Sequence, residues 1–273
     1  MSSSRGAIKI LDGGVGTELI RNGQRLPKHI WSAHANLNNP ELLLRIHRDF
    51  INSGAGYITT NTFRTTPRAY AKTGLSDTNA IITAEKSLST AVQIAKEAAT
   101  GTAKVMGSIA PLEDCYSPDL YPGPNLARDE FGIISGWLDD AGVDGFLIET
   151  MNNIEETDSC LAAVKNYDKP IWIGFNLSSS SSLLSGQSLQ DALAIAQNYG
   201  AECVLLNCNP LELTLKAINL LSESAICEWG IYPNLGVGLP SPDGRISKLH
   251  SDDELLSIIE TAIDKGASVV GGC

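Results

Sequence analysis

Polar and thiol side chains follow eight short apolar runs in this chain of 273 residues. Taken singly, each has a structural interpretation as a turn former, a helix cap or a buried thiol. If the runs are parallel strands of one sheet, these side chains meet at one edge, where barrel enzymes carry their chemistry. In chain order they are Asp12-Gly13-Gly14, Asn61-Thr62, Ser108, Glu149-Thr150, Asn176, Asn207-Cys208-Asn209, Asn234 and Gly272-Cys273.

Two of the six cysteines, Cys208 and Cys273, are the strongest candidates for chemistry. They end the sixth and the eighth run, so the closure of a barrel could bring both sulfurs to one metal ion. Zinc suits such a site, because it binds thiolates tetrahedrally and keeps a position open for a substrate sulfur. A thiol bound there loses its proton near neutral pH and becomes a nucleophile. No role in the site is predicted for Cys115, Cys160, Cys203 and Cys227.

The apolar runs alternate with longer stretches of helical spacing, and several of these stretches carry helix start and stop signals. Ser251 and Glu254 resemble a capping box. Left-handed helix C-caps are expected at Gly54, Gly142, Gly200 and Gly266. Strands are predicted at 8–11, 57–60, 104–107, 145–148, 171–175, 203–206, 227–232 and 268–270. Helices are predicted at 40–53, 78–99, 128–141, 155–166, 188–199, 211–222 and 252–265.

Eight parallel strands joined by helices predict an α/β fold, a (β/α)8 TIM barrel that forms a single domain over residues 1–273. A doubly wound open sheet is the alternative, but the segment that begins at Gly14 lacks the third glycine of a dinucleotide-binding fingerprint. Irregular loops are expected at 111–124 and 178–182. The helix after strand eight is absent from this chain, so the outer face of strands eight and one needs another element, a second subunit or a longer natural chain as its cover.

The composition is that of an ordinary soluble globular protein, with 43% hydrophobic and 19% charged residues. A net charge of −11 repels nucleic acid and anionic membrane surfaces, and no basic patch offsets it. The N-terminal apolar run is too short for a signal peptide or a membrane span. We therefore expect a cytoplasmic protein with no nucleic-acid partner and no membrane partner.

A series of short motifs extends over essentially the whole chain. Together and in this order they resemble the homocysteine S-methyltransferase family, whose members are zinc-dependent (β/α)8 barrels that move a methyl group from a sulfonium, ammonium or corrinoid donor to homocysteine. The motifs are Asp12-Gly13-Gly14-Val15-Gly16-Thr17-Glu18-Leu19, Thr60-Asn61-Thr62-Phe63, Gly107-Ser108-Ile109-Ala110-Pro111, Ile148-Glu149-Thr150-Met151, Ser185-Gly186, Leu206-Asn207-Cys208, Tyr232-Pro233-Asn234 and Val270-Gly271-Gly272-Cys273.

The resemblance implies roles for individual residues. Cys208 and Cys273 match two of the family's zinc thiolates, which makes them the metal-binding and catalytic candidates. The Asp12-Gly13-Gly14 turn and Glu149 would hold the amino-acid end of homocysteine, because glycine amides can donate to a carboxylate and Glu149 can pair with an ammonium group. Further candidates for substrate binding are Asn61, Ser108 and Asn234.

The family's third zinc ligand is a second cysteine directly after the one that matches Cys273, and this sequence ends before that position. Two protein thiolates and a substrate thiolate leave a tetrahedral ion one ligand short. We therefore expect the chain to bind zinc weakly or not at all.

The expected reaction is in-line attack of the homocysteine thiolate on the methyl group of a sulfonium donor, either S-methylmethionine or S-adenosylmethionine, which forms methionine. The loop at 111–124 is a candidate lid over the donor.

A barrel that binds an amino acid without catalysis is the alternative function. A lyase or aldolase ranks last, because no predicted strand end offers a Schiff-base lysine. The uncovered outer face of strands eight and one is expected to permit self-association. Rings that could face a cationic donor belong to Phe63, Tyr116, Tyr121 and Phe175.

Overall fold

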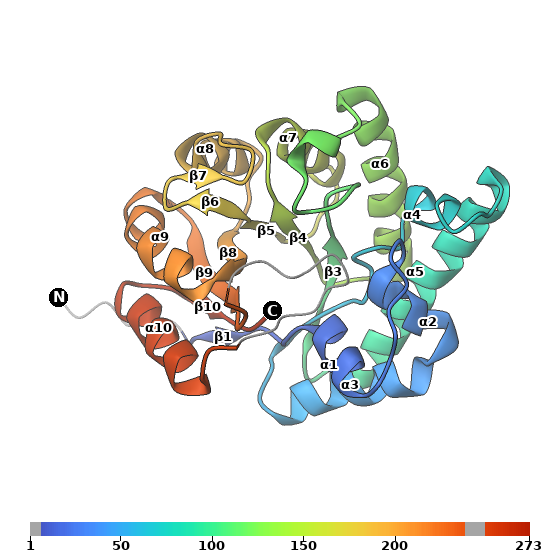
Figure 1. The fold of residues 1–273 in the computed structure, drawn as a ribbon, viewed down its shortest axis with the longest axis horizontal. Helices are drawn as coiled ribbons and strands as arrows, with labels where there is room; N and C mark the ends of the chain where they lie inside the picture. Colours follow the sequence, from blue (N-terminus) through green and yellow to red (C-terminus); the bar gives the residue numbers. More distant parts are fainter. Residues whose placement is uncertain (1–6, 238–248) are drawn as a thin grey trace.

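The predicted α/β barrel is present in the computed structural model, which describes residues 7–237 and 249–273. Its main sheet has eight strands in the order β1-β10-β9-β8-β5-β4-β3-β2, and every neighbouring pair is parallel. A parallel bridge between Leu11 and Tyr57 connects the two ends of this order and closes the ring. Figure 1 looks down the barrel and shows the helices arranged around the strands. The leading segment 1–6, in which we expected no targeting signal, lies outside the described residues.

The observed strands match the predicted runs, with differences mainly at their carboxyl ends. β4 and β8 continue past the predicted ends because each contains a register shift, in β4 between Ile148 and Met151 and in β8 between Asn207 and Pro210. The barrel strands are β1 (Lys9–Ile10), β2 (Tyr57–Thr59), β3 (Lys104–Ile109), β4 (Gly145–Met151), β5 (Ile171–Phe175), β8 (Cys203–Pro210), β9 (Glu228–Asn234) and β10 (Val269–Val270).

The seven predicted helices are all present, and short helices precede some of them. The Ser251–Glu254 capping box opens α10, and all four C-cap glycines have the left-handed backbone that their positions required. α6 begins four residues earlier than predicted because Pro124 occupies its first turn, where a missing backbone N–H costs nothing. The long helices are α3 (Pro40–Asn52), α5 (Asp77–Ala99), α6 (Pro124–Ala141), α7 (Ile154–Val164), α8 (Leu189–Asn198), α9 (Leu211–Ser224) and α10 (Asp252–Asp264). The short ones are α1 (Val15–Arg21), α2 (His34–Asn38), α4 (Pro67–Ala71), η1 (Trp31–Ala33) and η2 (Pro118–Leu120).

The segment 178–182, predicted as a flexible loop, is instead most of an antiparallel hairpin formed by β6 (Leu177–Ser179) and β7 (Ser182–Leu183). The serine run gave no apolar alternation from which a strand could be recognised. Leu177 and Leu183 are buried, and their side chains anchor the hairpin in the core.

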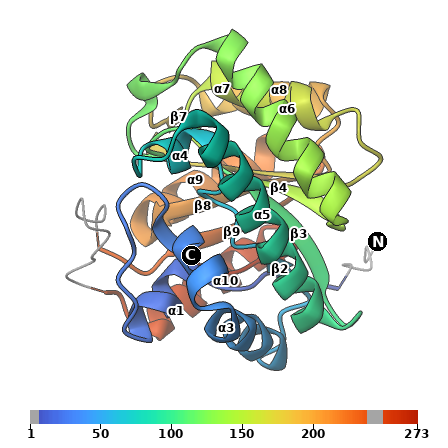
Figure 2. The ribbon, with the colours of Figure 1, turned by 90° about the vertical axis from the view of Figure 1, so that its right-hand side faces the viewer.

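The core has two main parts, one between the strands and the helices and one inside the barrel. Outward-facing strand residues pack with the inner faces of the helices, for example α5 and α6 against β3 (Figure 2). Inside the barrel, Lys9 lies 5.6 Å above the ring of Trp172, which contacts Tyr57 at a centroid distance of 4.8 Å and fills the amino-terminal end. Above them the interior is packed with Leu11, Met106, Leu147, Leu205 and Val269.

A polar layer lies over this apolar interior, two residues further along the strands. Successive residues of a strand alternate between its two faces, so residues two positions after an inward-facing residue also face inward. The layer therefore sits at the carboxyl end of the barrel, where the sequence places the candidate chemistry. It contains Thr59, Ser108, Glu149, Gly174 and Asn207.

The outer face of β1 is only partly covered. Ile10 points outward and is 45% exposed. Self-association through this face stays a prediction. None of the described helices has the length and hydropathy needed to cross a membrane.

Candidate active site at the carboxyl end of the barrel

Asp12 is held rigidly at the end of β1. Its Oδ2 accepts a hydrogen bond of 2.8 Å from the backbone N–H of Thr59, and its Oδ1 accepts one of 2.9 Å from the Thr59 hydroxyl group. Both bonds come from β2, the neighbour that closes the barrel. Asp12 is only 4% exposed, so it is part of the floor of the mouth, the opening at the carboxyl end of the barrel.

Two glycines after Asp12 allow the backbone to pass close to the end of the chain. A Cβ atom on Gly14 would lie 2.7 Å from the carbonyl carbon of Cys273, and one on Gly13 would lie 2.8 Å from the ring of Phe50. Any larger residue would therefore push the turn away from Cys273. The backbone N–H of Gly272 also donates to the Asp12 carbonyl oxygen at 3.2 Å, which fixes β10 to this turn.

Glu149 lies on β4, and both of its carboxyl oxygens have hydrogen-bond donors. The Ser108 hydroxyl group donates to Oε2, and the Tyr232 hydroxyl group donates to Oε1 at 3.3 Å. Ser108 and Glu149, both predicted at strand ends, are thus brought together on β3 and β4. Tyr232 was not predicted as a site residue. It lies two residues before Asn234 in the same strand, so both side chains face the same side of the sheet, and this spacing could have identified it.

Burial raises the pKa values of both carboxyl groups. Loss of hydration raises the pKa of Glu149 to about 7, although the hydrogen bonds from Ser108 and Tyr232 oppose this change. Burial likewise raises the pKa of Asp12 to about 8, against the opposing hydrogen bonds from Thr59 and with a further increase from the charge of Glu149. The negative charge of Glu149 raises the pKa of Asp12, so a cation near these two groups would stabilise their charged forms.

The sulfur atoms of Cys208 and Cys273 meet at the mouth, as the barrel prediction required. They are joined as a disulfide with a Cα–Cα distance of 5.6 Å, rather than free for a metal ion as the sequence suggested. Two thiols that converge at this separation are within bonding range of each other when no metal holds them apart. The other cysteines, Cys115, Cys160, Cys203 and Cys227, are free.

The central residues of the mouth are accessible to a small molecule. Gly13, Gly14, Glu149, Cys208 and Cys273 each keep part of their surface exposed, whereas the residues beneath them are buried. In the described part of the chain no group of three or more histidine, cysteine, aspartate or glutamate side chains is arranged to hold a metal ion.

Three of the five asparagines at the strand ends have different surroundings. Asn61 donates both amide hydrogens, to the Ser32 carbonyl oxygen at 2.8 Å and to Asn36 Oδ1 at 2.7 Å, so its amide group supports the segment before α3 rather than the mouth. Asn234 accepts a hydrogen bond from the backbone N–H of Gly236. Asn176 donates to the Cys208 carbonyl oxygen at 3.3 Å, and its buried Oδ1 has no hydrogen-bond partner.

The aromatic candidates are only partly suited to a donor site. Phe175 is fully buried in the core between the barrel and the helices, and it therefore does not face the mouth. The Tyr121 hydroxyl group lies 2.9 Å from that of Ser159 on α7, which places its ring on the helical side. Phe63 and Tyr116 remain half-buried near the strand ends, and the side chain of Arg64 lies 5.1 Å from the ring of Phe63.

The first part of the 111–124 loop is fixed to the barrel. Arg64 donates to the carbonyl oxygens of Pro111 and Glu113, and Glu156 accepts the backbone N–H of Leu112 at 2.8 Å. A role of this loop as a lid stays a prediction.

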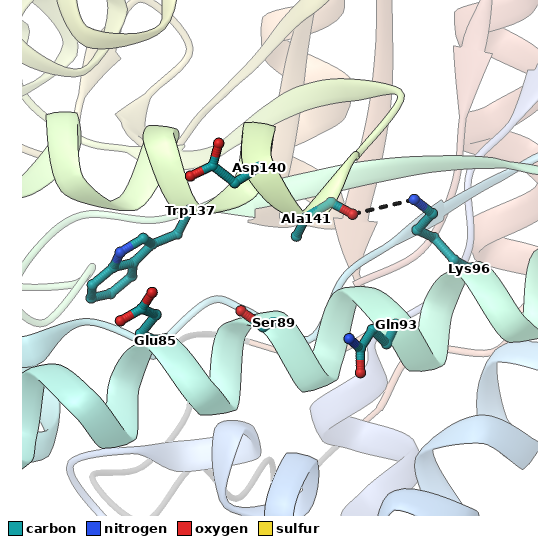
Figure 3. A pocket seen from close by; sticks show the side chains of 7 residues that line it. All are labelled: Glu85, Ser89, Gln93, Lys96, Trp137, Asp140 and Ala141. Carbon is teal, nitrogen blue, oxygen red and sulfur yellow. Dashed lines mark hydrogen bonds between the residues drawn. The ribbon is translucent and has the colours of Figure 1, made fainter.

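A groove of about 460 Å³ is present elsewhere, on the outside of the molecule between α5 and α6. Figure 3 shows Trp137 and Asp140 on one side of it and Glu85, Ser89 and Gln93 on the other. None of these residues lies at a strand end, so the groove is separate from the candidate site.

The fold is a (β/α)8 barrel, and its carboxyl end carries paired cysteines and two desolvated carboxyl groups. The profile of the family described as "Homocysteine S-methyltransferase" matches residues 9–273. The chain belongs to this family of enzymes.

Relatives of known identity match over nearly the whole chain. Homocysteine S-methyltransferase of Escherichia coli is 28% identical over 97% of this chain and 90% of its own length, and selenocysteine methyltransferase of Astragalus bisulcatus is 26% identical over 98% and 88%. The crystal structure of the metallated form of the Escherichia coli homocysteine methyltransferase MmuM superposes with a TM-score of 0.84 at 26% identity and covers 98% of this chain and 92% of that one. The oxidized form of MmuM also has a TM-score of 0.84, at 26% identity over 97% and 91%.

Proposed function

We propose that this protein transfers a methyl group from a small sulfonium donor to the thiol of homocysteine and so forms methionine. The observation that carries this proposal is the convergence of Cys208 and Cys273 at the mouth, where Cys273 lies against Gly14. The charge of Glu149 acts on Asp12 at the same end of the barrel. A thiol-activating pair and groups that can bind an amino acid would thus share one mouth. Family membership and the full-length relatives support the same acceptor.

The paired cysteines suit a thiolate-binding metal ion in the type of their donor atoms and in their convergence. In their reduced form Cys208 and Cys273 would hold zinc, with the thiol of homocysteine and one further donor completing four ligands. Zinc bound there would lower the pKa of the incoming thiol, so that the sulfur becomes a thiolate at neutral pH. The crystal structure of a metallated form of MmuM supports the use of a metal ion in this family.

The mouth would bind the two charged ends of an amino acid separately. The ammonium group would pair with Glu149 and lie close to Asp12, where it supplies the cation that these buried carboxyl groups lack. The carboxylate would accept hydrogen bonds from backbone amides of the Gly13-Gly14 turn. Held at both ends, homocysteine can extend its thiol toward Cys208 and Cys273.

The methyl transfer itself requires only alignment and a free electron pair on sulfur. The homocysteine thiol first loses its proton; its sulfur then attacks the donor methyl carbon in line with the bond that breaks. A new carbon–sulfur bond forms in methionine, and the bonding electrons of the old one return to the donor sulfur, which becomes a neutral thioether. We propose S-methylmethionine or S-adenosylmethionine as the donor, because each carries a methyl group on a sulfonium sulfur that leaves as a neutral thioether.

The test is a methyl-transfer assay on the full chain with homocysteine and each donor, in the presence of zinc and a reductant. We expect methionine to form, and we expect Cys208→Ser to lower the rate of its formation at least about 100-fold. Cys227→Ser is the matched control, because Cys227 is a free and half-buried thiol that takes no part in the site.

A barrel that binds the amino acid without catalysis remains the second candidate. Calorimetry with homocysteine, with and without zinc, distinguishes the two. Binding without any methyl transfer from either donor under zinc repletion would support the second candidate and contradict the first.

A further inference from the structure

Gly174 on β5 occupies an inward-facing position in the polar layer of the barrel. A Cβ atom built on it would lie 2.4 Å from Asn207 Oδ1 and 3.1 Å from the Tyr232 hydroxyl oxygen. Real side chains do not tolerate the first of these distances, so the absence of a side chain at Gly174 is what leaves room for both neighbours. The backbone conformation at Gly174 is not in the left-handed region, and it therefore does not require glycine for any other reason.

Asn207 uses this space to reach across β5. It lies on β8, and its Oδ1 accepts a hydrogen bond of 3.0 Å from the backbone N–H of Thr150 on β4, although β5 separates these two strands in the sheet. Thr150 has a positive φ of 54° and directly follows Glu149. A hydrogen bond to its amide thus supports an unfavourable backbone conformation beside the carboxyl group of the site.

Tyr232 uses the same space from the next strand. It is paired in register with Asn207, and its hydroxyl group donates to Glu149 Oε1 at 3.3 Å. Tyr232 is 2% exposed, so the bond is shielded from water. The end of β4 is therefore held at its backbone by Asn207 and at its side chain by Tyr232, and both contacts pass over Gly174.

We propose that Gly174, Asn207 and Tyr232 are positioning residues for Glu149, with Gly174 providing the gap through which the other two reach β4. This inference rests on the proposed function, in which Glu149 binds the ammonium group of homocysteine. It assigns the three residues to substrate affinity rather than to the methyl-transfer step. None of them touches the substrate in this scheme.

Steady-state kinetics of Tyr232→Phe test the role of the hydroxyl group. We expect the KM for homocysteine to rise roughly tenfold, because a hydrogen bond to a charged group is lost, while kcat and the KM for the donor stay within about twofold of the wild-type values. Loss of the bond also raises the pKa of Glu149, so the acidic limb of kcat/KM for homocysteine should move to higher pH. The control is Tyr57→Phe, which removes a hydroxyl group at the opposite end of the barrel interior.

A double-mutant cycle tests the gap without any reference to catalysis. Gly174→Ala should lower the midpoint of thermal unfolding by about 5 °C, because the new methyl group displaces Asn207 Oδ1. In an Asn207→Ala background the same change should lower the midpoint by about 1 °C, because the atoms of Asn207 that the methyl group would displace are gone and only the Tyr232 hydroxyl oxygen, at 3.1 Å, remains close. Gly56→Ala is the control, since a Cβ atom there meets no other atom within 4 Å.

The two experiments separate failure of this inference from failure of the proposed function. An unchanged KM in an active Tyr232→Phe enzyme, or equal destabilisation by Gly174→Ala in both backgrounds, would overturn the inference alone. A wild-type chain that neither binds nor methylates homocysteine would overturn the proposed function. The double-mutant cycle would still show whether Asn207 needs the space that the missing side chain of Gly174 leaves.

Discussion

The carboxyl groups of Asp12 and Glu149 are the residues whose surroundings most clearly point to a ligand. Each is desolvated, each has its oxygens supplied with hydrogen bonds, and neither has a cationic side chain among the causes of its pKa change. A protein gains no stability from two such acids placed together. An amino acid's ammonium group between them accounts for the arrangement, and no side chain of the site supplies that charge.

Replacement of Glu149 by glutamine should weaken homocysteine binding strongly. Glu149→Gln keeps the size of the side chain but removes the charge that pairs with the ammonium group, so we expect KM for homocysteine to rise roughly 100-fold. Isothermal calorimetry and initial rates measure this change. Glu260→Gln, on the exposed face of α10, should leave both unchanged, and an equal effect of the two substitutions would contradict the role of Glu149.

The raised pKa of Glu149 also predicts how binding depends on pH. Below its pKa of about 7 the group is protonated and cannot pair with an ammonium ion, so affinity for homocysteine should fall by roughly 30-fold between pH 8 and 5.5. Asp12, with a pKa of about 8, changes affinity in the same direction. Calorimetry across this range measures the effect, and Glu149→Gln should flatten most of it.

The stability of the ligand-free protein should change with pH in the opposite sense. Because the folded state raises the pKa of Glu149 from 4.5 to about 7, it holds the proton more tightly than the unfolded chain does. The stability that this provides is complete below pH 4.5 and is lost as the pH rises through 7. Denaturant titrations of the wild type and of Glu149→Gln at several pH values isolate this contribution; a parallel dependence in both would contradict it.

At the scale of the elements, the sequence was sufficient for the seven long helices and the eight barrel strands, but not for the contacts that cross between strands. The period of the apolar residues located every barrel strand, and the capping signals placed the ends of α10 and α6 to within a few residues. The hairpin at Leu177–Leu183 was missed, because its serines show neither period. The role of Gly174 could not be predicted from the sequence. It depends on the side chains of Asn207 and Tyr232 that pack against this glycine, and the sequence does not show these contacts.

The capping box of α10 allows a direct test at this scale. The Ser251 hydroxyl group accepts the backbone N–H of Glu254, whose carboxylate accepts the N–H of Ser251 in return. Ser251→Ala should therefore lower the free energy of unfolding by about 1 kcal/mol. Ser257→Ala, further along the same helix and without a capping bond, should change it by less than about 0.5 kcal/mol in urea titrations. Equal effects would show that the cap contributes nothing specific.

For the whole molecule, the closure of the barrel is what creates the site. Cys208 and Cys273 are remote in the sequence, and only the arrangement of β8 and β10 on either side of β9 brings them together. The sequence predicted this meeting from strand number alone. It could not predict that the pair would be bonded, because the oxidation state of two thiols depends on their surroundings and not on their positions in the chain.

Zinc binding should therefore depend on reduction. We expect the reduced 273-residue chain to bind zinc weakly, with less than one ion retained after dialysis, and the oxidised chain to bind none. Metal analysis of both forms measures this, with Cys273→Ser as the variant that should lose the remaining affinity. Tight, stoichiometric zinc in the reduced chain would contradict the expected shortage of ligands.

The bond between Cys208 and Cys273 also makes a covalent ring that contains α9, β9 and α10. A protease that cuts once within 209–272 cannot divide the oxidised protein into separate polypeptides, because the two products remain tethered at the mouth. A single cut between residues 12 and 208 lies outside the ring and releases a fragment. Electrophoresis of nicked protein, with and without a reductant, would therefore read out the state of the paired thiols in a preparation before any assay of its activity.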